Sequence, residues 1–273
     1  MDIRTDFADE LINKGKQEEY IKHSKTLKGV KQTVIEIIKE KNQFNKEKGK
    51  YISIDFNNLY DENDRINITN MLITSLKELH KVKQNSKVLI VGLGNSKIIA
   101  DSLGPNVADK VIVTNHLFKV IPDDIEKDMN KVCVLTPKVM GQTGLESADI
   151  VEAVSDLFKP DLVIVIDALA SSSIKRVNKV IQLSDTGIAP GSGVGNYRKE
   201  ITQRKLNAKV IAIGVATVVE ASNIVSEMIG KNIEDSHLNL ILTPKEIDED
   251  IEHLSTIIAT SINKYIHKDA NKM

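Results

Sequence analysis

The sequence predicts an α/β protein, namely a three-layer sandwich with a mostly parallel sheet. From Lys87 onward, short runs rich in Val and Ile alternate with segments of helical periodicity, which is the pattern of strands joined by crossover helices. The run LVIVI at residues 162–166 is continuously apolar, as expected for a strand that is covered on both faces.

The part of the chain before Lys87 is more polar. Residues up to about 50 are rich in Lys and Glu, a composition typical of a solvated surface. The apolar runs at residues 34–37 and 51–54 are predicted to pair as strands, and a helix is predicted over residues 68–80. We expect residues 7–85 to form a polar N-terminal region that packs on the core of a single domain spanning residues 7–273.

The remaining elements are predicted from apolar runs and helix start signals. Strands are predicted at residues 87–91, 132–135, 162–166, 180–183 and 210–213. The letters TGLE at residues 143–146 have the pattern of a capping box that begins a helix, and Pro160 would end that helix. A second box, TPKE at residues 243–246, places Pro at the first position of a final helix with one apolar stripe.

Composition narrows the class of partner. The chain has 273 residues and a formal net charge of −1, so no overall basic excess points to nucleic acid. Aromatic residues make up only 4%, which argues against base-stacking surfaces. A charged first segment and the lack of a run of about 18 apolar residues predict neither a secretory signal nor a membrane span. We therefore expect a cytoplasmic protein.

Cys133 is the one cysteine of the chain, so no internal disulfide can form. It stands in the apolar run VCVL at residues 132–135, which favours a buried structural thiol over a nucleophile. This usage fits a reducing cytoplasm.

Polar and glycine-rich segments follow the predicted strands. Ligands of open α/β sheets bind beyond the carboxyl ends of the strands, so these segments are candidate substrate loops. Asp167 is the strongest single candidate, because a carboxylate directly after five apolar residues is costly to desolvate without hydrogen bonds or a chemical role. The alternative is an Asp that caps a loop or a helix. The candidate loop residues are Gly92, Gly94, Asn95, Asp185, Thr186, Gly187, Gly191, Gly193, Gly195 and Asn196.

Several chemistries remain to be compared at such a site. Two converging carboxylates could share a proton and act as general base and general acid in hydrolysis. They could also hold a metal, but the six histidines are scattered and no His-x-x-x-His or Cys-x-x-Cys spacing is present. Lys97 stands where a dinucleotide fingerprint needs its third glycine. We expect neither a metal nor a cofactor.

Six segments resemble the germination proteases of spore-forming bacteria. They occur in the family's order over nearly the whole chain. The segments are VGLGN at 91–95, DSLGP at 101–105, IDALA at 166–170, IQLSDTGIAPGSGVGN at 181–196, IAIGV at 211–215 and LTPKE at 242–246. Two departures are Ala100, where the family usually has Pro, and a segment near residues 229–241 that is shorter than in longer members.

The resemblance implies an atypical aspartic endopeptidase that degrades small acid-soluble spore proteins in the spore core during germination. It carries the family's two catalytic aspartates over to Asp101 and Asp167. Asp101 enters through the resemblance alone. The resemblance also implies a fold similar to that of hydrogenase-maturation endopeptidases, a zymogen, a homotetramer and no cofactor. Because the substrates coat DNA, the enzyme is expected to contact DNA-binding proteins and not DNA itself.

The letters TDFADE at residues 5–10 are similar to the context Thr-Glu-(Phe/Ile)-Ala-Ser-Glu, in which the family's substrates are cut before the apolar residue. This similarity predicts self-cleavage between Asp6 and Phe7, with residues 1–6 as a short propeptide. The alternative is that these residues only begin a helix, with Thr5 or Asp6 as its N-cap.

Two other functions stay open from the sequence. One is a non-catalytic sporulation protein that binds a peptide or a partner on the same fold. The other is a metal-binding maturation factor, which would need a third ligand beside the two aspartates.

Overall fold

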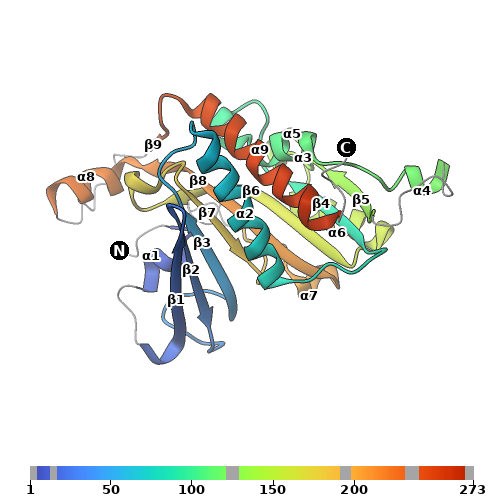
Figure 1. Ribbon diagram of the computed structural model, residues 1–273, viewed down its shortest axis with the longest axis horizontal. Helices are drawn as coiled ribbons and strands as arrows, with labels where there is room; N and C mark the ends of the chain where they lie inside the picture. The colour runs from blue at the N-terminus through green and yellow to red at the C-terminus, as the bar shows by residue number, and fades with distance from the viewer. Residues whose placement is uncertain (1–4, 13–16, 121–128, 191–197, 231–239, 268–273) are drawn as a thin grey trace.

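Nine strands among the described residues form one mixed sheet (Figure 1). The computed structural model describes residues 5–12, 17–120, 129–190, 198–230 and 240–267. The strand order is β1-β2-β3-β7-β8-β6-β4-β5, and β9 pairs with β8. The strands are β1 (Tyr20–Leu27), β2 (Val30–Ile37), β3 (Gly49–Asp55), β4 (Lys87–Gly92), β5 (Lys131–Leu135), β6 (Leu162–Ser171), β7 (Val180–Ser184), β8 (Lys209–Glu220) and β9 (Ile241–Leu242).

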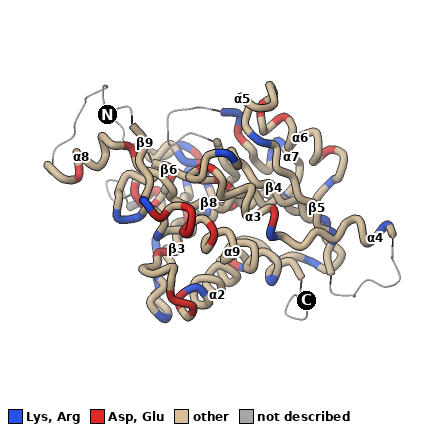
Figure 2. Tube along the Cα trace, turned by 90° about the horizontal axis from the view of Figure 1, so that it is seen from above, with Lys and Arg blue, Asp and Glu red and all other residues tan. Residues whose placement is uncertain are grey.

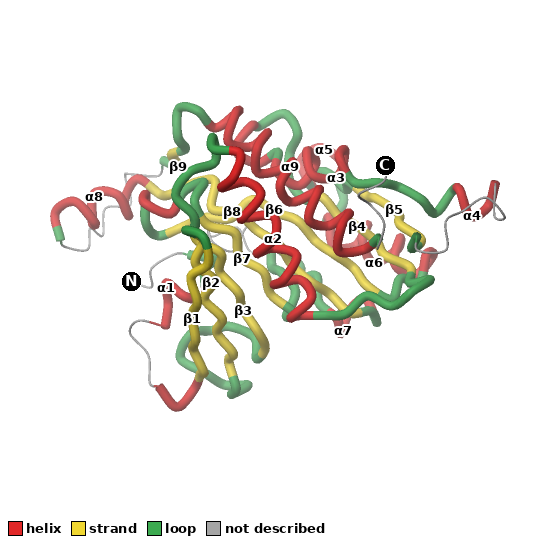
Figure 3. The backbone as a smooth tube through the Cα atoms, in the orientation of Figure 1, coloured by secondary structure: helices red, strands yellow, loops and turns green. Residues whose placement is uncertain are grey.

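Helices cover both faces of the sheet, so the predicted three-layer α/β sandwich is confirmed. Helices α2, α3 and α9 lie on one face (Figure 3), and α6 and α7 pack on the other. The helices are α1 (Ala8–Leu11), α2 (Glu62–Leu79), α3 (Leu103–Lys110), α4 (Leu117–Val120), α5 (Met140–Thr143), α6 (Ser147–Phe158), α7 (Gln203–Leu206), α8 (Ala221–Ile229) and α9 (Ile247–Ile266), with 3-10 turns η2 (Gln17–Glu19), η3 (Ile99–Asp101) and η5 (Ile174–Arg176).

The parallel part of the sheet consists of β5, β4, β6 and β8. Strand β7 runs antiparallel to β8, and β3, β2 and β1 extend the sheet further by antiparallel pairing. The pairing predicted for residues 34–37 and 51–54 is confirmed, since Val34 is the register partner of Ile52. The reversed direction of β7 matters for the site, because its carboxyl end points away from the carboxyl ends of β4 and β6.

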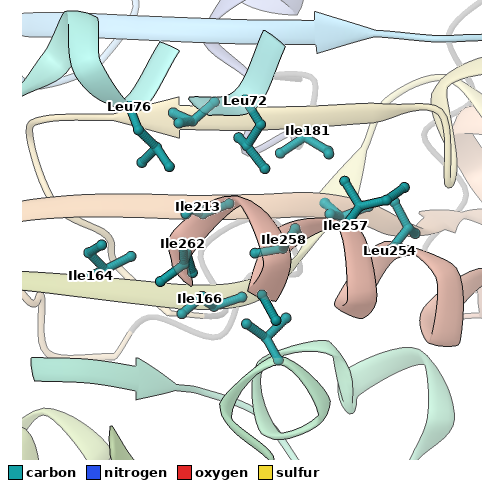
Figure 4. Close-up of a cluster of buried hydrophobic side chains, with 14 of the residues drawn as sticks. Leu72, Leu76, Ile164, Ile166, Ile181, Ile213, Leu254, Ile257, Ile258 and Ile262 are labelled. Carbon is teal, nitrogen blue, oxygen red and sulfur yellow. The ribbon is translucent and has the colours of Figure 1, made fainter. Parts of the chain in front are cut away.

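The larger core lies between the sheet and helices α2 and α9 (Figure 4). Every second residue of the central strands enters it, because successive side chains of a strand point to opposite faces. Burying one such Leu or Ile contributes about 1.5–3 kcal/mol. The residues labelled in Figure 4 are Leu72, Leu76, Ile164, Ile166, Ile181, Ile213, Leu254, Ile257, Ile258 and Ile262.

Both predicted capping boxes are wrong. Thr143 ends α5, and Gly144 in a left-handed conformation separates it from α6, whose N-cap is Glu146 without a side-chain hydrogen bond. The second box fails because the Thr243 hydroxyl donates to the carbonyl of Thr217 in β8 at 2.8 Å. Helix α9 instead begins at Ile247 with three acidic residues in its first turn, where the helix dipole favours negative charge.

Strands β6 and β8 run past their predicted ends. They pair with each other as far as Ser171 and Val219, so Asp167 and Gly214 lie within strands and not in the loops after them. The predicted buried thiol, Cys133, is half-buried against the cluster under α6. Burial raises the pKa of this thiol, in agreement with a structural role.

Charged residues of both signs are interspersed along the described chain (Figure 2). No described helix combines the length and the apolar character that a bilayer span requires.

Candidate active site

Asp167 lies where β6 loses its neighbour on one side. Strand β4 ends at Gly92, which pairs with Ile166, so the edge of β6 from Asp167 onward is free of β4. The Asp167 side chain is only 5% exposed, and its Oδ1 accepts a hydrogen bond from the amide of Ala168 at 3.0 Å. Burial raises the pKa of Asp167 well above its usual range, and the negative charges of Asp101 and Asp6 raise it further.

Asp101 closes the loop that follows β4. Its Oδ2 accepts from the amide of Asn95 at 2.9 Å, and its carbonyl accepts from the same amide at 3.0 Å. Gly94 has a φ of +112°, and a Cβ there would lie 2.0 Å from the Asp101 carbonyl oxygen, so only glycine lets the loop wrap this closely. Burial raises the pKa of Asp101, opposed by the Asn95 hydrogen bond.

The charge of Asp101 acts on Asp167 and raises its pKa. Ionising both is unfavourable in this buried position, so the pair keeps one proton to a higher pH than separate, solvated carboxyl groups would. A pair that holds one proton can supply a general base and a general acid at the same time.

Gly214 of β8 lies between Asp167 and Gln182 in the sheet. It is the register partner of Asp167 in β6 and of Gln182 in β7. Register partners point to the same face of a sheet, so both side chains project from the face opposite α2 and α9. A Cβ at residue 214 would lie 2.3 Å from Cδ1 of Leu169, because Leu169 fills the space that the glycine leaves.

The N-terminal segment of residues 5–10 lies on the free edge of β6. The amide of Asp6 donates to the carbonyl of Ala170 at 3.1 Å, and the Asp6 carboxylate accepts from the amide of Ala170 at 3.0 Å. At this one residue the contacts resemble the pairing of an added strand, with the Asp6 carboxylate in place of a backbone acceptor. Neither Thr5 nor Asp6 caps α1, whose N-cap is Phe7.

The peptide bond between Asp6 and Phe7 is surrounded by side-chain hydrogen bonds. The carbonyl oxygen of Asp6 accepts from Lys46 Nζ at 2.9 Å and from Gln182 Nε2 at 3.1 Å. The amide of Ala8 donates to Gln182 Oε1 at 2.9 Å. Gln182 thus binds one group on each side of Phe7.

Phe7 and the acidic residues after it are held by an apolar pocket and by Arg176. The Phe7 side chain is fully buried among Leu169, Val180, Ala216 and Ile188. The Arg176 guanidinium lies 4.9 Å from the centre of the Phe7 ring, within the range of a cation–π contact.

Arg176 also pairs with both acids of α1. It binds Asp9 at 2.8 Å and Glu10 at 3.0 Å. The Glu10 carboxylate further accepts hydrogen bonds from Ser171 and Ser172.

Residues 3–236 of the chain match the family model described as germination protease. The chain belongs to the germination protease family. As a member it is a protease of spore germination. The germination protease of Clostridium acetobutylicum is 39% identical over 88% of this chain and 86% of that protein. The one from Oceanobacillus iheyensis is 44% identical over 75% of this chain and 58% of that protein.

Among solved structures, the chain is similar to the [NiFe] hydrogenase maturation protease HycI from Thermococcus kodakarensis. The match covers 65% of this chain and 92% of that one, with 19% identity and a TM-score of 0.35. A score this low carries no conclusion, so the fold class rests on the sheet and helices described above.

The other candidate loop residues fall into three groups. Gly92, Gly94 and Asn95 do lie around Asp101. Asp185, Thr186 and Gly187 lie elsewhere: Asp185 accepts from the amide of Lys50 at 2.8 Å and pairs with Lys209, the first residue of β8. They are candidates because they follow a strand, and since β7 is antiparallel, its carboxyl end points away from those of β4 and β6. Gly191, Gly193, Gly195 and Asn196 lie outside the described residues.

No third metal ligand is found beside the two aspartates in the part of the chain that the structure describes. There, no group of three His, Cys, Asp or Glu residues is placed to hold a metal ion.

Sequence reasoning overlooked three residues at this candidate site: Lys46, Gln182 and Arg176. Gln182 carried a usable signal, because it interrupts the apolar run of residues 180–183 just as Asp167 follows the run of residues 162–166. Lys46 is one of many lysines in a polar segment, and Arg176 stands outside any recognised motif, so nothing local distinguished either of them.

Proposed function

We propose that this germination protease hydrolyses peptide bonds with Asp101 and Asp167, and that its own Asp6–Phe7 bond is the first one cut. One carboxylate takes a proton from the attacking water, and its protonated partner delivers a proton to the departing nitrogen of Phe7. The observation that carries the proposal is the position of Asp6, which pairs with Ala170 on the free edge of β6, three residues after Asp167.

The same contacts support a zymogen. Phe7 and the α1 acids occupy the surface that an incoming peptide of the family's substrate sequence would need. The segment therefore competes with a substrate in trans until the bond is cut and the new N-terminus leaves. The remaining chain, residues 7–273, stays a single domain in this proposal.

The substrates that we propose are small acid-soluble spore proteins, reached in the forespore or spore core. Their sequence context places an acidic residue, an apolar residue and a later glutamate in the positions of Asp6, Phe7 and Glu10. Arg176 and the Phe7 pocket are matched in charge and polarity to such a sequence.

We also propose that the protein assembles as a homotetramer, as the family resemblance implies. Large apolar side chains on α8, on β9 and directly before β9 are exposed, a feature typical of association surfaces. They are Met228, Ile229, Leu240, Ile241 and Leu242. Light scattering of the purified protein measures the mass.

The catalytic roles are tested by the intact mass of purified protein before and after mild acidification. The wild type is expected to lose residues 1–6, whereas Asp101→Asn and Asp167→Asn stay intact because each removes one of the two carboxyl groups. Asp109→Asn, at an exposed position, is the matched control and should be cut like the wild type.

Two results would contradict the proposal. Equal loss of residues 1–6 from the two aspartate variants would show that other groups cut the bond. If neither the chain nor a peptide with the sequence Thr-Glu-Phe-Ala-Ser-Glu is cut, the non-catalytic, partner-binding function is favoured instead.

A further inference from the structure

The carbonyl oxygen of Asp6 is the atom on which negative charge would develop if water attacked the Asp6–Phe7 bond. Two side-chain donors already reach it, Lys46 Nζ at 2.9 Å and Gln182 Nε2 at 3.1 Å. They come from separate parts of the sheet: Lys46 from the connection between β2 and β3, and Gln182 from β7.

Gln182 is held in one orientation. Its Oε1 accepts the amide of Ala8 at 2.9 Å, so its Nε2 hydrogens are directed at the Asp6 carbonyl. The side chain is only 7% exposed and stands two strands from Asp167, with the bare backbone of Gly214 between them. Asp167 and Gln182 thus project from the same face of the sheet on either side of Gly214.

Lys46 brings a positive charge to the same oxygen. The residue is partly exposed at the surface, but burial of its ammonium group lowers its pKa, while the charges of Asp6 and Glu10 act to raise it. An ammonium group in a partly dehydrated site stabilises a nearby developing charge more strongly than it would in water.

We propose that Lys46 and Gln182 are catalytic residues that stabilise the charge on the scissile carbonyl oxygen, first at Asp6 and then in substrates cut in trans. This inference rests on the proposed function. Water adds to the carbonyl carbon and gives its proton to one carboxylate of the pair, while the electron pair of the C=O bond moves to the oxygen between Lys46 and Gln182. The carbonyl then re-forms as the C–N bond breaks, and the Phe7 nitrogen takes the proton of the second carboxyl group.

The test measures the single-turnover rate of self-cleavage for Lys46→Met and Gln182→Met. Loss of one such donor typically lowers the rate on the order of 10²-fold or more, and we expect this for each variant. Lys46→Arg keeps a charged donor and should recover part of the rate. Lys48→Met, at an exposed position of the same connection, is the control and should match the wild type.

A peptide substrate separates carbonyl stabilisation from binding. With Thr-Glu-Phe-Ala-Ser-Glu, loss of a donor that acts in the transition state lowers kcat and leaves KM nearly unchanged. Circular dichroism of each variant reports whether its fold is intact. A variant that binds the peptide with wild-type KM has an intact site even if its thermal stability has changed.

A second comparison removes the other partner that Lys46 could serve, the Asp6 carboxylate. If Lys46 acts on the carbonyl, Lys46→Met slows cleavage by the same factor in an Asp6→Asn background as in the wild type. If Lys46 only neutralises the carboxylate, the factor falls to about one in that background, and the proposal is overturned for Lys46.

The outcomes distinguish this inference from the function on which it rests. If Lys46→Met and Gln182→Met both cleave themselves at rates within twofold of the wild-type rate, the inference alone is refuted and the two aspartates stay as proposed. A wild type that cuts neither itself nor the peptide would refute both.

Discussion

Replacing Asp167 by Asn should stabilise the folded protein at neutral pH, even though it removes a proposed catalytic group. Asn keeps the shape of the side chain and an oxygen that accepts the Ala168 amide. It removes an ionisable group whose folded-state pKa is raised by burial and by the charges of Asp101 and Asp6, against a single hydrogen bond that lowers it.

The sign follows from proton linkage. A carboxyl group with a raised pKa binds its proton more tightly in the folded state than in the unfolded state. At a pH below its pKa in the unfolded state, about 4, it therefore does not reduce the free energy of unfolding. As the pH rises from there through the raised pKa, the folded state loses stability. Above that window, the free energy of unfolding of Asp167→Asn should exceed that of the wild type by about 1.4 kcal/mol for each unit of the pKa shift.

The assay is urea unfolding followed by far-ultraviolet circular dichroism from pH 3.5 to pH 8, since the chain has no Trp to report by fluorescence. Mass spectrometry of each sample ensures that intact chains are compared. The two curves of unfolding free energy should meet at the acidic end and separate as the pH rises. In Asp101→Asn the wild-type loss of stability should be smaller, because one source of repulsion is gone. A wild type that gains stability relative to Asp167→Asn as the pH rises would refute the reasoning.

Two further substitutions address the parts that position the site. Gly94→Ala places a Cβ 2.0 Å from the Asp101 carbonyl oxygen at a φ of +112°, so the rate of self-cleavage should fall at least tenfold. Gly141→Ala is the control and should leave the rate unchanged, because its Cβ would meet no atom within 4 Å. Equal rates in the two variants would show that the geometry of the Gly94 loop is dispensable. Arg176→Ala removes the ion pairs with α1 and the contact with Phe7, and loss of a desolvated charge partner costs about 2–5 kcal/mol. Hydrogen exchange of residues 5–12 should therefore speed up, while that of residues 162–166 of β6, which pair with β4, is unchanged. Exchange as slow as in a variant at the exposed Arg204 would contradict the role given to Arg176.

Local pattern was enough to find part of the site. Asp167 was identified because a carboxylate next to a strand of five apolar residues is costly unless it has partners or a task. The glycines of residues 92–94 were identified because a chain that must turn closely around another segment needs them. No local pattern distinguishes Asp101, which became a candidate beside Asp167 only through its family motif.

The position of Asp185 and the omission of Gln182 share one cause, which is strand direction. Asp185 was a candidate substrate-loop residue because it follows a strand, and ligands of open α/β sheets bind beyond the carboxyl ends of parallel strands. Because β7 is antiparallel, its end faces Lys209, and its middle residue, Gln182, comes level with Asp167. Periodicity reports that a segment is a strand but not which way it runs.

The sequence by itself determined the alternation of strands and helices, the buried character of β4, β6 and β8, the family, and the candidate bond between Asp6 and Phe7. These follow from the apolar period and from motifs, which are local properties of the chain. The tertiary structure alone decided that residues 5–10 lie on the open edge of β6 and that Lys46 and Gln182 meet the Asp6 carbonyl. Those contacts join residues 40 and 176 positions apart, and only the pairing order of the strands brings them together.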